Sequence, residues 1–395
     1  MSRGLGDVYK RQENSGWLIN GKKPNTASAP GIVSAEMTWE TVRSWNIGFD
    51  FGLLNNRLTG SFDYFVRNTL DMIGPAPQLP ATLGATVPKV NNADMKAWGF
   101  EVEVSWRDRI KDFNYGVKFV LSDDQRKVTR YPNEELNRNQ WYAGRMDGLV
   151  WGYETVGIAK TDAEMEAHLA SLPNGGQSQL GSKWAAGDIM YKDLNGDGKI
   201  SSGDGTLNDL GDLKVVANTQ LRFKYGLTLD ASWKGFDFSA FFQGVGKRDV
   251  VVGGPYFWGA NGQGMWQAAA FKDHMDYFRP EDTESVFGPN VDAYYPRVIF
   301  GGGSSEGGKN TLTQSRYVQN GAYIRLKNLQ LGYTLPSTIT KKFAVNSLRV
   351  YVSGDNLWTG TKMRVFDPEV LGSTGDAGKA YPLARVWSVG LNVNF

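Results

Sequence analysis

The sequence contains no cysteine and only two histidines. Without cysteine the chain has no disulfide framework, no thiol nucleophile and no thiolate metal site. The net charge is only +2 in 395 residues, so no strongly basic field points to nucleic acid. Neither His168 nor His274 has the neighbours that a serine hydrolase would need. We therefore expect a protein that is not an enzyme.

Long apolar runs are also missing. No stretch of about 18 apolar residues occurs, which excludes a transmembrane helix. The first twelve residues, MSRGLGDVYKRQ, lack the apolar core of a signal peptide and differ in character from the rest. We interpret residues 1–12 as a non-native leader or assembly scar and residues 13–41 as a lead-in loop. The interpretation of residues 42–395 rests on their composition and on the pattern of apolar and polar residues.

Glycine and aromatic residues are abundant, with 48 Gly, 20 Phe, 17 Tyr and 13 Trp. Aromatic side chains suit pleated surfaces, and glycine serves turns and close backbone contacts, so this composition favours β-structure. The mean hydropathy of −0.39 is low for a membrane protein. It still permits a transmembrane β-barrel, in which only every second strand residue faces lipid.

Apolar and polar residues alternate with a period of two through most of the chain, which predicts roughly nine long strands. Predicted strands of 11–14 residues exceed the usual ~5–6 of globular proteins and can cross a bilayer at a tilt. The runs that follow this rule are 45–53, 58–66, 98–106, 113–121, 223–233, 236–244, 323–335, 348–356 and 383–395.

The connections between these runs alternate strictly between short and long. Short connections lie near 53–57, 107–112, 233–236 and 336–347, and long ones near 70–95, 125–220, 247–320 and 357–382. An up-and-down barrel would place all short turns on one side and all long loops on the other, as outer-membrane barrels do. We predict an all-β fold: a segment of an antiparallel transmembrane barrel with long extracellular loops.

The last strand carries Leu391, Val393 and the terminal Phe395 on one face. A terminal aromatic residue on such a strand resembles the signal that the barrel-assembly machinery reads in outer-membrane proteins. If Phe395 is periplasmic, an odd number of strands leaves the first one without an antiparallel partner. We therefore expect the chain to be the C-terminal part of a larger barrel, with further N-terminal strands elsewhere.

Several short stretches, in this order and spacing, resemble the SusC/RagA-like TonB-dependent outer-membrane transporters of Bacteroidetes over about residues 39–395. These stretches are WNIGFD (45–50), RLTGSFDYF (57–65), WGFEV (98–102), GDI (187–189) followed by DLNGDG (193–198), YIRLKN (323–328), LGY (331–333), SGDNL (353–357), FDPEV (366–370) and GLNVNF (390–395).

The resemblance implies a barrel of about 22 strands closed by an N-terminal plug. It further implies active import of oligosaccharides or peptides, a SusD-like surface lipoprotein that acts as a lid, and energy from the TonB complex through the absent N-terminal part. Two alternatives stay open. One is a passive porin or adhesin-like barrel, and the other is a secreted β protein that binds glycans.

One loop follows the oxygen-ligand spacing of an EF-hand, with Gly198 at its sharp turn. Oxygen donors at this spacing suit a hard cation, so we expect a structural Ca²⁺ that stiffens a long loop. Asp204 stands where an EF-hand has Glu, and its shorter side chain leaves Mg²⁺ as an alternative cation. An Asn/Asp/Gly-rich turn without metal is the competing interpretation. The predicted ligands are Asp193, Asn195, Asp197, Lys199 through its carbonyl, Ser201 and Asp204.

Aromatic residues in the long loops are candidates for substrate contact, because flat ring faces can stack on sugars. The competing interpretations are packing within the loops, an interface with a lid, and an aromatic girdle at the membrane interface. The candidates are Trp151, Tyr153, Tyr256, Phe257, Trp258 and Trp266.

Overall fold

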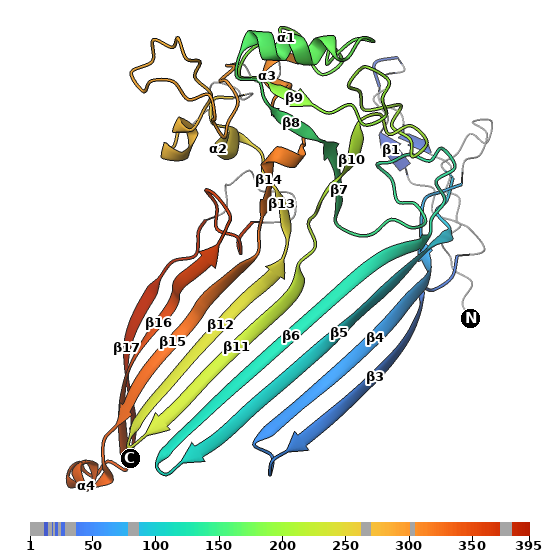
Figure 1. The fold of residues 1–395 in the computed structure, drawn as a ribbon. Helices are drawn as coiled ribbons and strands as arrows, with labels where there is room; N and C mark the ends of the chain where they lie inside the picture. Colours follow the sequence, from blue (N-terminus) through green and yellow to red (C-terminus); the bar gives the residue numbers. More distant parts are fainter. Residues whose placement is uncertain are drawn as a thin grey trace.

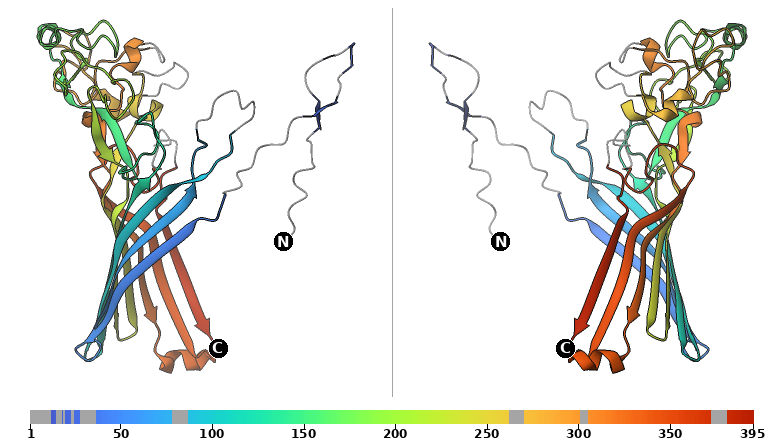
Figure 2. Two further views of the ribbon diagram at one scale, coloured as in Figure 1. Left: turned by 90° about the vertical axis from the view of Figure 1, so that its right-hand side faces the viewer. Right: turned by 90° about the vertical axis from the view of Figure 1, so that its left-hand side faces the viewer.

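The structure is a computed structural model. It describes residues 12–14, 18, 20–22, 25–27, 37–77, 87–261, 270–300, 305–371 and 381–395. Its main feature is one antiparallel sheet of nine long strands, curved like part of a barrel wall (Figures 1 and 2). In spatial order the strands are β3 (Thr41–Leu53), β4 (Leu58–Ile73), β5 (Asn91–Ile110), β6 (Phe113–Arg130), β11 (Arg222–Trp233), β12 (Phe236–Lys247), β15 (Tyr323–Thr334), β16 (Ser347–Thr361) and β17 (Val386–Asn394).

Each strand pairs with its neighbour in sequence, apart from the small elements inside the long loops. Tight turns join β3 to β4, β5 to β6 and β11 to β12, and they use residues with positive φ such as Asn55, Lys111 and Gly235. The short helix α4 (Ser337–Thr340) and the 3₁₀ turn η5 (Lys341–Phe343) join β15 to β16. These connections and the C-terminus lie at one end of the sheet (Figure 1). The predicted nine-strand meander and its sorted loops are confirmed.

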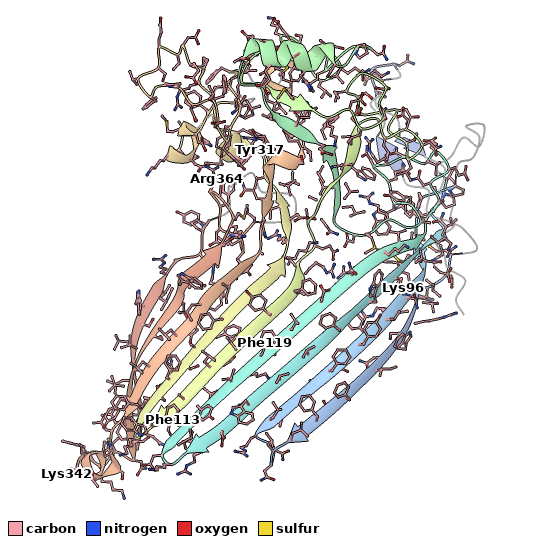
Figure 3. The ribbon with its side chains drawn as sticks, in the orientation of Figure 1. Lys96, Phe113, Phe119, Tyr317, Lys342 and Arg364 are labelled. Carbon is pink, nitrogen blue, oxygen red and sulfur yellow. The ribbon has the colours of Figure 1, made fainter. Side chains whose placement is uncertain are left out.

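The two faces of the sheet differ as the alternation predicts. Cross-strand pairs such as Phe62 with Val102 lie on one face, and pairs such as Asp63 with Glu101 lie on the other. On the apolar face, Ile47 is 67% exposed, Leu331 56% and Val389 78%. No core of the described residues covers these side chains, and the face is continuous from Lys96 through Phe119 to Phe113 (Figure 3). A soluble β protein would bury such a face, so this observation disfavours the secreted glycan-binding alternative.

The long loops fold together into a body above the other end of the sheet, which we call the cap (Figures 1 and 2). Its core contains Tyr191 and Phe257, both fully buried, and segments of several different loops. Its elements are β7 (Leu149–Tyr153), β8 (Thr155–Ile158), α1 (Asp162–Ala170), β9 (Ile189–Tyr191), β10 (Leu213–Asn218), β13 (Asp249–Val251), α2 (Pro255–Trp258), η3 (Lys272–Met275), α3 (Ser305–Gly308), η4 (Ser315–Tyr317) and β14 (Val318–Asn320).

Two small strands, β1 (Gln12–Asn14) and β2 (Asn25–Ala27), pair with each other. Within the described residues, no helix is both long enough and apolar enough to span a bilayer.

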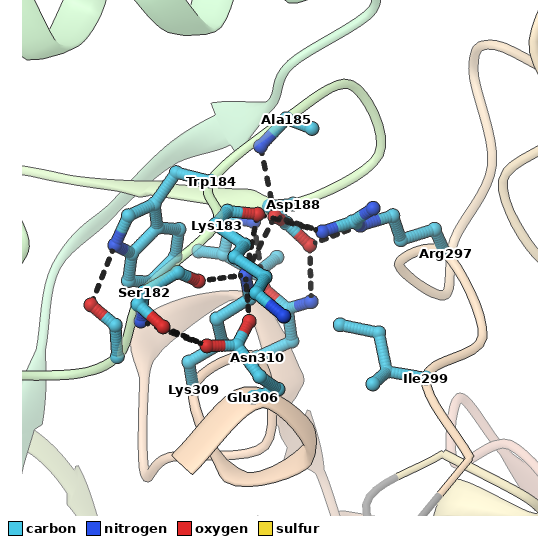
Figure 4. A network of polar contacts seen from close by, with 12 residues as sticks. Ser182, Lys183, Trp184, Ala185, Asp188, Arg297, Ile299, Glu306, Lys309 and Asn310 are labelled. Atoms are coloured by element: carbon cyan, nitrogen blue, oxygen red, sulfur yellow. Dashed lines mark hydrogen bonds and ion pairs between the residues drawn. The ribbon is translucent and has the colours of Figure 1, made fainter.

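A buried ion pair connects two long loops of the cap (Figure 4). The Lys309 Nζ lies 3.0 Å from the Asp188 Oδ2, and both side chains are 0% exposed. Arg297 lies 2.7 Å from the other oxygen of Asp188. Lys309 also donates to the carbonyl of Ser182 at 2.7 Å and lies 4.6 Å from the ring centre of Trp184. Because every charge has a partner, the pair can stay buried and hold the loops in register.

We expect Lys309→Met to destabilise the cap by about 3–5 kcal/mol, because it leaves the Asp188 charge buried with fewer partners. Hydrogen exchange of the amides around residues 182–191 measures this loss. Lys160→Met is the matched control, since the Lys160–Asp292 pair is exposed. Equal exchange rates in the two variants would contradict a stabilising role for the buried pair.

Candidate functional site

The polar face of the sheet is hollowed in two places. The first hollow, of about 880 Å³, lies over β3 to β6 and the start of β11. Its lining has charges of both signs, including Asp63, Arg67, Glu101, Arg126 and Lys224. Mixed charge over such an area suits a polar or zwitterionic solute better than an apolar one.

Ion pairs between neighbouring strands and within β6 hold several charges of this face. Lys224 Nζ lies 2.7 Å from Asp124 Oδ1, and Arg126 Nε lies 3.8 Å from Asp124 Oδ2. Towards the turns, Lys118 lies 2.7 Å from Glu103. These side chains are partly exposed, so they can exchange a neighbour for a ligand at small cost in free energy.

The second hollow, of about 780 Å³, lies on the same face directly below the cap. Its floor comes from β6, β11 and β12, and its upper edge includes Pro368, Glu369 and Leu371. It shares Asp124, Arg126 and Lys224 with the first hollow, so the two are continuous.

The segment at that edge is tied to the wall by buried cations. Arg325 of β15 is 2% exposed and lies 2.6 Å from Asp367 and 3.2 Å from Glu369. Arg248 donates to the carbonyls of Pro368 and Leu371 at 2.9 and 2.6 Å. Pairing of this kind needs partners some 40 or more residues apart, which the sequence pattern alone does not reveal. The FDPEV stretch therefore closes the upper edge of the second hollow.

Three aromatic candidates for substrate contact lie in the core of the cap. Phe257 is 0% exposed, Trp258 6% and Tyr153 7%. Phe257 packs edge-on against Tyr295 and Tyr317, with ring centres 5.4 and 5.9 Å apart. Rings covered in this way have no face free for a sugar, so the arrangement favours the packing interpretation for these three residues.

The other aromatic candidates differ in their surroundings. Tyr256 is 36% exposed and stacks on Phe271 with ring centres 5.8 Å apart. Trp151 is half-buried on β7, and its indole N–H is buried without a hydrogen-bond acceptor. Trp266 lies outside the described residues. Substrate contact by these residues stays a prediction.

The loop predicted to bind a cation is a tight turn that bonds to its own backbone. Asp193 accepts hydrogen bonds from the N–H groups of Gly196 and Gly198 at 2.7 and 2.9 Å. Asn195 accepts from the N–H of Asp197 at 3.0 Å, and Asp197 from that of Lys199 at 3.1 Å. The turn thus has the sharp form that the glycine spacing predicts.

Asp212, which the sequence pattern does not single out, is the buried carboxylate of this loop. It accepts from the N–H groups of Leu194 and Ser201, both at 2.7 Å. Burial raises the pKa of Asp212, and the nearby carboxylates of Asp193 and Asp197 raise it further.

Asp204, predicted as the twelfth-position ligand, instead accepts from the N–H of Thr206 at 2.7 Å. Its pKa is lowered, first by its hydrogen bonds to Thr206. Among the described residues, no three acidic or histidine side chains are grouped as a metal site would require. Cation binding by this loop stays a prediction. The roles of the Lys199 carbonyl and of Ser201 as ligands stay part of that prediction.

The end of the last strand has the predicted alternation. Leu391 and Val393 lie on the apolar face, paired with Val350 and Leu348 of β16. Phe395 is 82% exposed beside the short connections. The residues expected to signal barrel assembly are therefore accessible, and that role stays a prediction.

No protein-family model matches the chain. Among curated proteins, TonB-dependent receptor P3 of Formosa agariphila is 27% identical over 402 residues, which cover 96% of this chain and 36% of the relative. TonB-dependent receptor SusC of Bacteroides thetaiotaomicron is 23% identical over 373 residues, covering 94% of this chain and 33% of the relative. The chain spans between 33% and 38% of the length of the four curated relatives.

Among solved structures, the RagAB peptide transporter matches with a TM-score of 0.69 at 22% identity, covering 98% of this chain and 39% of that one. The RagAB peptide importer in its open-open state matches with a TM-score of 0.68. The resemblance to SusC/RagA-like TonB-dependent transporters is confirmed. The predicted fold, a partial transmembrane β-barrel, and the outer-membrane location are confirmed as well.

In this location the apolar face meets lipid. We expect Phe119→Arg, at mid-height of that face, to destabilise the folded barrel by about 2–4 kcal/mol, because a charge would enter the hydrocarbon. The fraction of heat-modifiable protein in isolated outer membranes reports the loss. Val120→Arg, one residue on and on the polar face, is the control and should assemble normally. Equal loss in both variants would count against the assignment of the faces.

If Ca²⁺ binds the 193–204 loop, millimolar Ca²⁺ should slow hydrogen exchange at Gly196 and Gly198, since a bound cation stabilises the folded loop. Asp193→Asn, Asp197→Asn and Asp204→Asn should each weaken the effect, because each removes the charge of a predicted ligand. Exchange that does not respond to Ca²⁺ in the unmodified chain would refute the cation prediction.

Proposed function

We propose that this chain is one section of an outer-membrane importer of peptides or oligosaccharides, which works with a SusD-like surface lipoprotein and takes its energy from TonB. The observation that carries the proposal is the continuous, mixed-charge hollow on the polar face beneath a folded extracellular cap. The names of the relatives, TonB-dependent receptors and a peptide transporter, support the same reading.

The chemistry of the hollow favours peptides over neutral glycans. Arg126, Lys224 and Asp124 present both signs within one network of ion pairs. A peptide has an ammonium and a carboxylate group that can replace partners in such a network. Three of the aromatic rings that would serve as sugar platforms, those of Tyr153, Phe257 and Trp258, are instead enclosed in the cap.

The cap supplies the surface on which a lipoprotein lid would rest. It stands beyond the ends of the strands and has its own core. A surface that keeps its shape can bind a partner without the entropy cost of ordering loops. This is the physical support for a lid partner at this end of the barrel.

The test is uptake by cells that express the protein from its own locus. We expect Arg126→Gln with Lys224→Gln to lower the uptake of a fluorescent mixed oligopeptide pool several-fold. Uptake of a fluorescent neutral oligosaccharide would change little. Lys341→Gln with Lys342→Gln removes the same charge at the connection between β15 and β16 and serves as the control. Unchanged peptide uptake in the first variant would refute the peptide assignment.

Partner and energy source are tested separately. Affinity purification of the tagged protein from outer membranes should recover one surface lipoprotein, and deletion of TonB should abolish uptake in the unmodified strain. Sequencing the locus should show a plug domain and an export signal in frame upstream, with a SusD-like gene next to them. Uptake that survives TonB deletion would favour the passive porin alternative.

A further inference from the structure

The apolar face ends on the cap side in a row of cations. The pairing of β3 to β6 places Arg43, Asn68, Lys96 and Lys127 side by side, one from each strand. Lys96 and Lys127 are direct cross-strand partners. Arg43 and Lys127 are exposed and Lys96 is half-buried, and Figure 3 shows Lys96 at this end of the wall.

No carboxylate of the described residues neutralises this row. The nearby acids Asp71 and Asp94 are already paired with Arg130, at 2.8 and 2.7 Å. Among the residues that the structure describes, the one charge-related contact of Lys96 is with the ring of Trp98, whose centre is 5.8 Å away. Like charges directly opposite each other destabilise a sheet. The arrangement therefore calls for an anion that the described residues do not supply.

The depth of the row points to the source of that anion. On β5 the apolar side chains that follow Lys96 run from Trp98 to Trp106. Eight residues of strand are about 26 Å long, and at a tilt of about 40° they span roughly 20 Å across the bilayer. This approaches the apolar band of outer-membrane barrels, about 25 Å tall. Lys96 and its neighbours in the row thus lie at the level of the outer headgroups.

The opposite rim shows a different arrangement. There Arg57 lies 5.9 Å from the ring centre of Trp106 and also 3.1 Å from the carboxylate of Asp108. Both rims thus place a cation against a tryptophan. The inner cation has an acid of its own, whereas the outer row has none among the described residues. The contrast indicates that the cations without an acidic partner lie at the outer leaflet, where an anion from outside the chain can pair with them.

We propose that Arg43, Lys96 and Lys127 form a binding site for the phosphate groups of outer-leaflet lipids. The row crosses three strand spacings, about 14 Å, which suits several phosphates of adjacent headgroups rather than one free ion. Arginine and lysine both form strong charge-assisted bonds to phosphate oxygens. The aromatic wall below the row then contacts the acyl chains of the same lipids.

The test compares two variants of the protein extracted in mild detergent from its own outer membrane. The first carries Arg43→Gln, Lys96→Gln and Lys127→Gln. The second, a matched control, carries Arg107→Gln, Lys341→Gln and Lys342→Gln and loses the same charge elsewhere. Mass spectrometry measures the phosphorylated lipid retained per protein, and heat-modifiable mobility confirms that each variant is folded.

We expect the first variant to retain at least about threefold less phosphorylated lipid than the unmodified protein, and the control to retain as much as the unmodified protein. Each of the single variants Arg43→Gln and Lys127→Gln should show a smaller loss, which keeps the test decisive if the triple variant does not fold. Equal retention in all variants would overturn the proposal, as would equal loss in the control. Displacement of the lipid by inorganic phosphate at comparable concentration would show a free-phosphate site and overturn the lipid assignment.

Discussion

The wall depends on one constraint, which is that hydrocarbon offers no partner to a backbone N–H or C=O group. The backbone of each strand inside the apolar band must therefore form its hydrogen bonds with the neighbouring strands. The pairings of β4 with β5 and of β5 with β6 accordingly run almost unbroken for most of their length. That register fixes which side chains face lipid. A slip of one residue would exchange Tyr64 for Asp63 at the membrane, so the polar face follows directly from the backbone pairing.

Beyond the bilayer the constraint is lifted, because water can satisfy the backbone, and the chain folds by burial of side chains instead. The cap folds in this second way. Its irregular loops enclose aromatic rings such as those of Phe257 and Tyr317, and the buried ion pair of Lys309 with Asp188 joins two of the loops. Aromatic residues used to hold the cap together are not free to contact a solute. The proposed recognition of a solute therefore rests on the charged wall below.

This division explains what the sequence could predict. Alternation with a period of two is local, so the strands, the faces and the alternation on β17 were all visible in the residues themselves. The burial of Phe257 was not, since it depends on Tyr295 and Tyr317 from further along the chain. The buried carboxylate of Asp212 was likewise not predicted, because the loop motif in the sequence ends at Asp204. The cation row needed the register of four strands, because none of Arg43, Lys96 and Lys127 is unusual alone.

The need for backbone hydrogen-bond partners in hydrocarbon also applies to the two outermost strands of the sheet. Within the described residues, β3 pairs only with β4 and β17 only with β16. An unpaired strand edge is costly in hydrocarbon, where water cannot replace the missing hydrogen bonds. The four curated relatives are two to three times as long as the matched region, which is more than enough for strands that would complete such pairing. A larger closed barrel is therefore what the backbone demands, and the mixed-charge hollow is best understood as one side of its lumen.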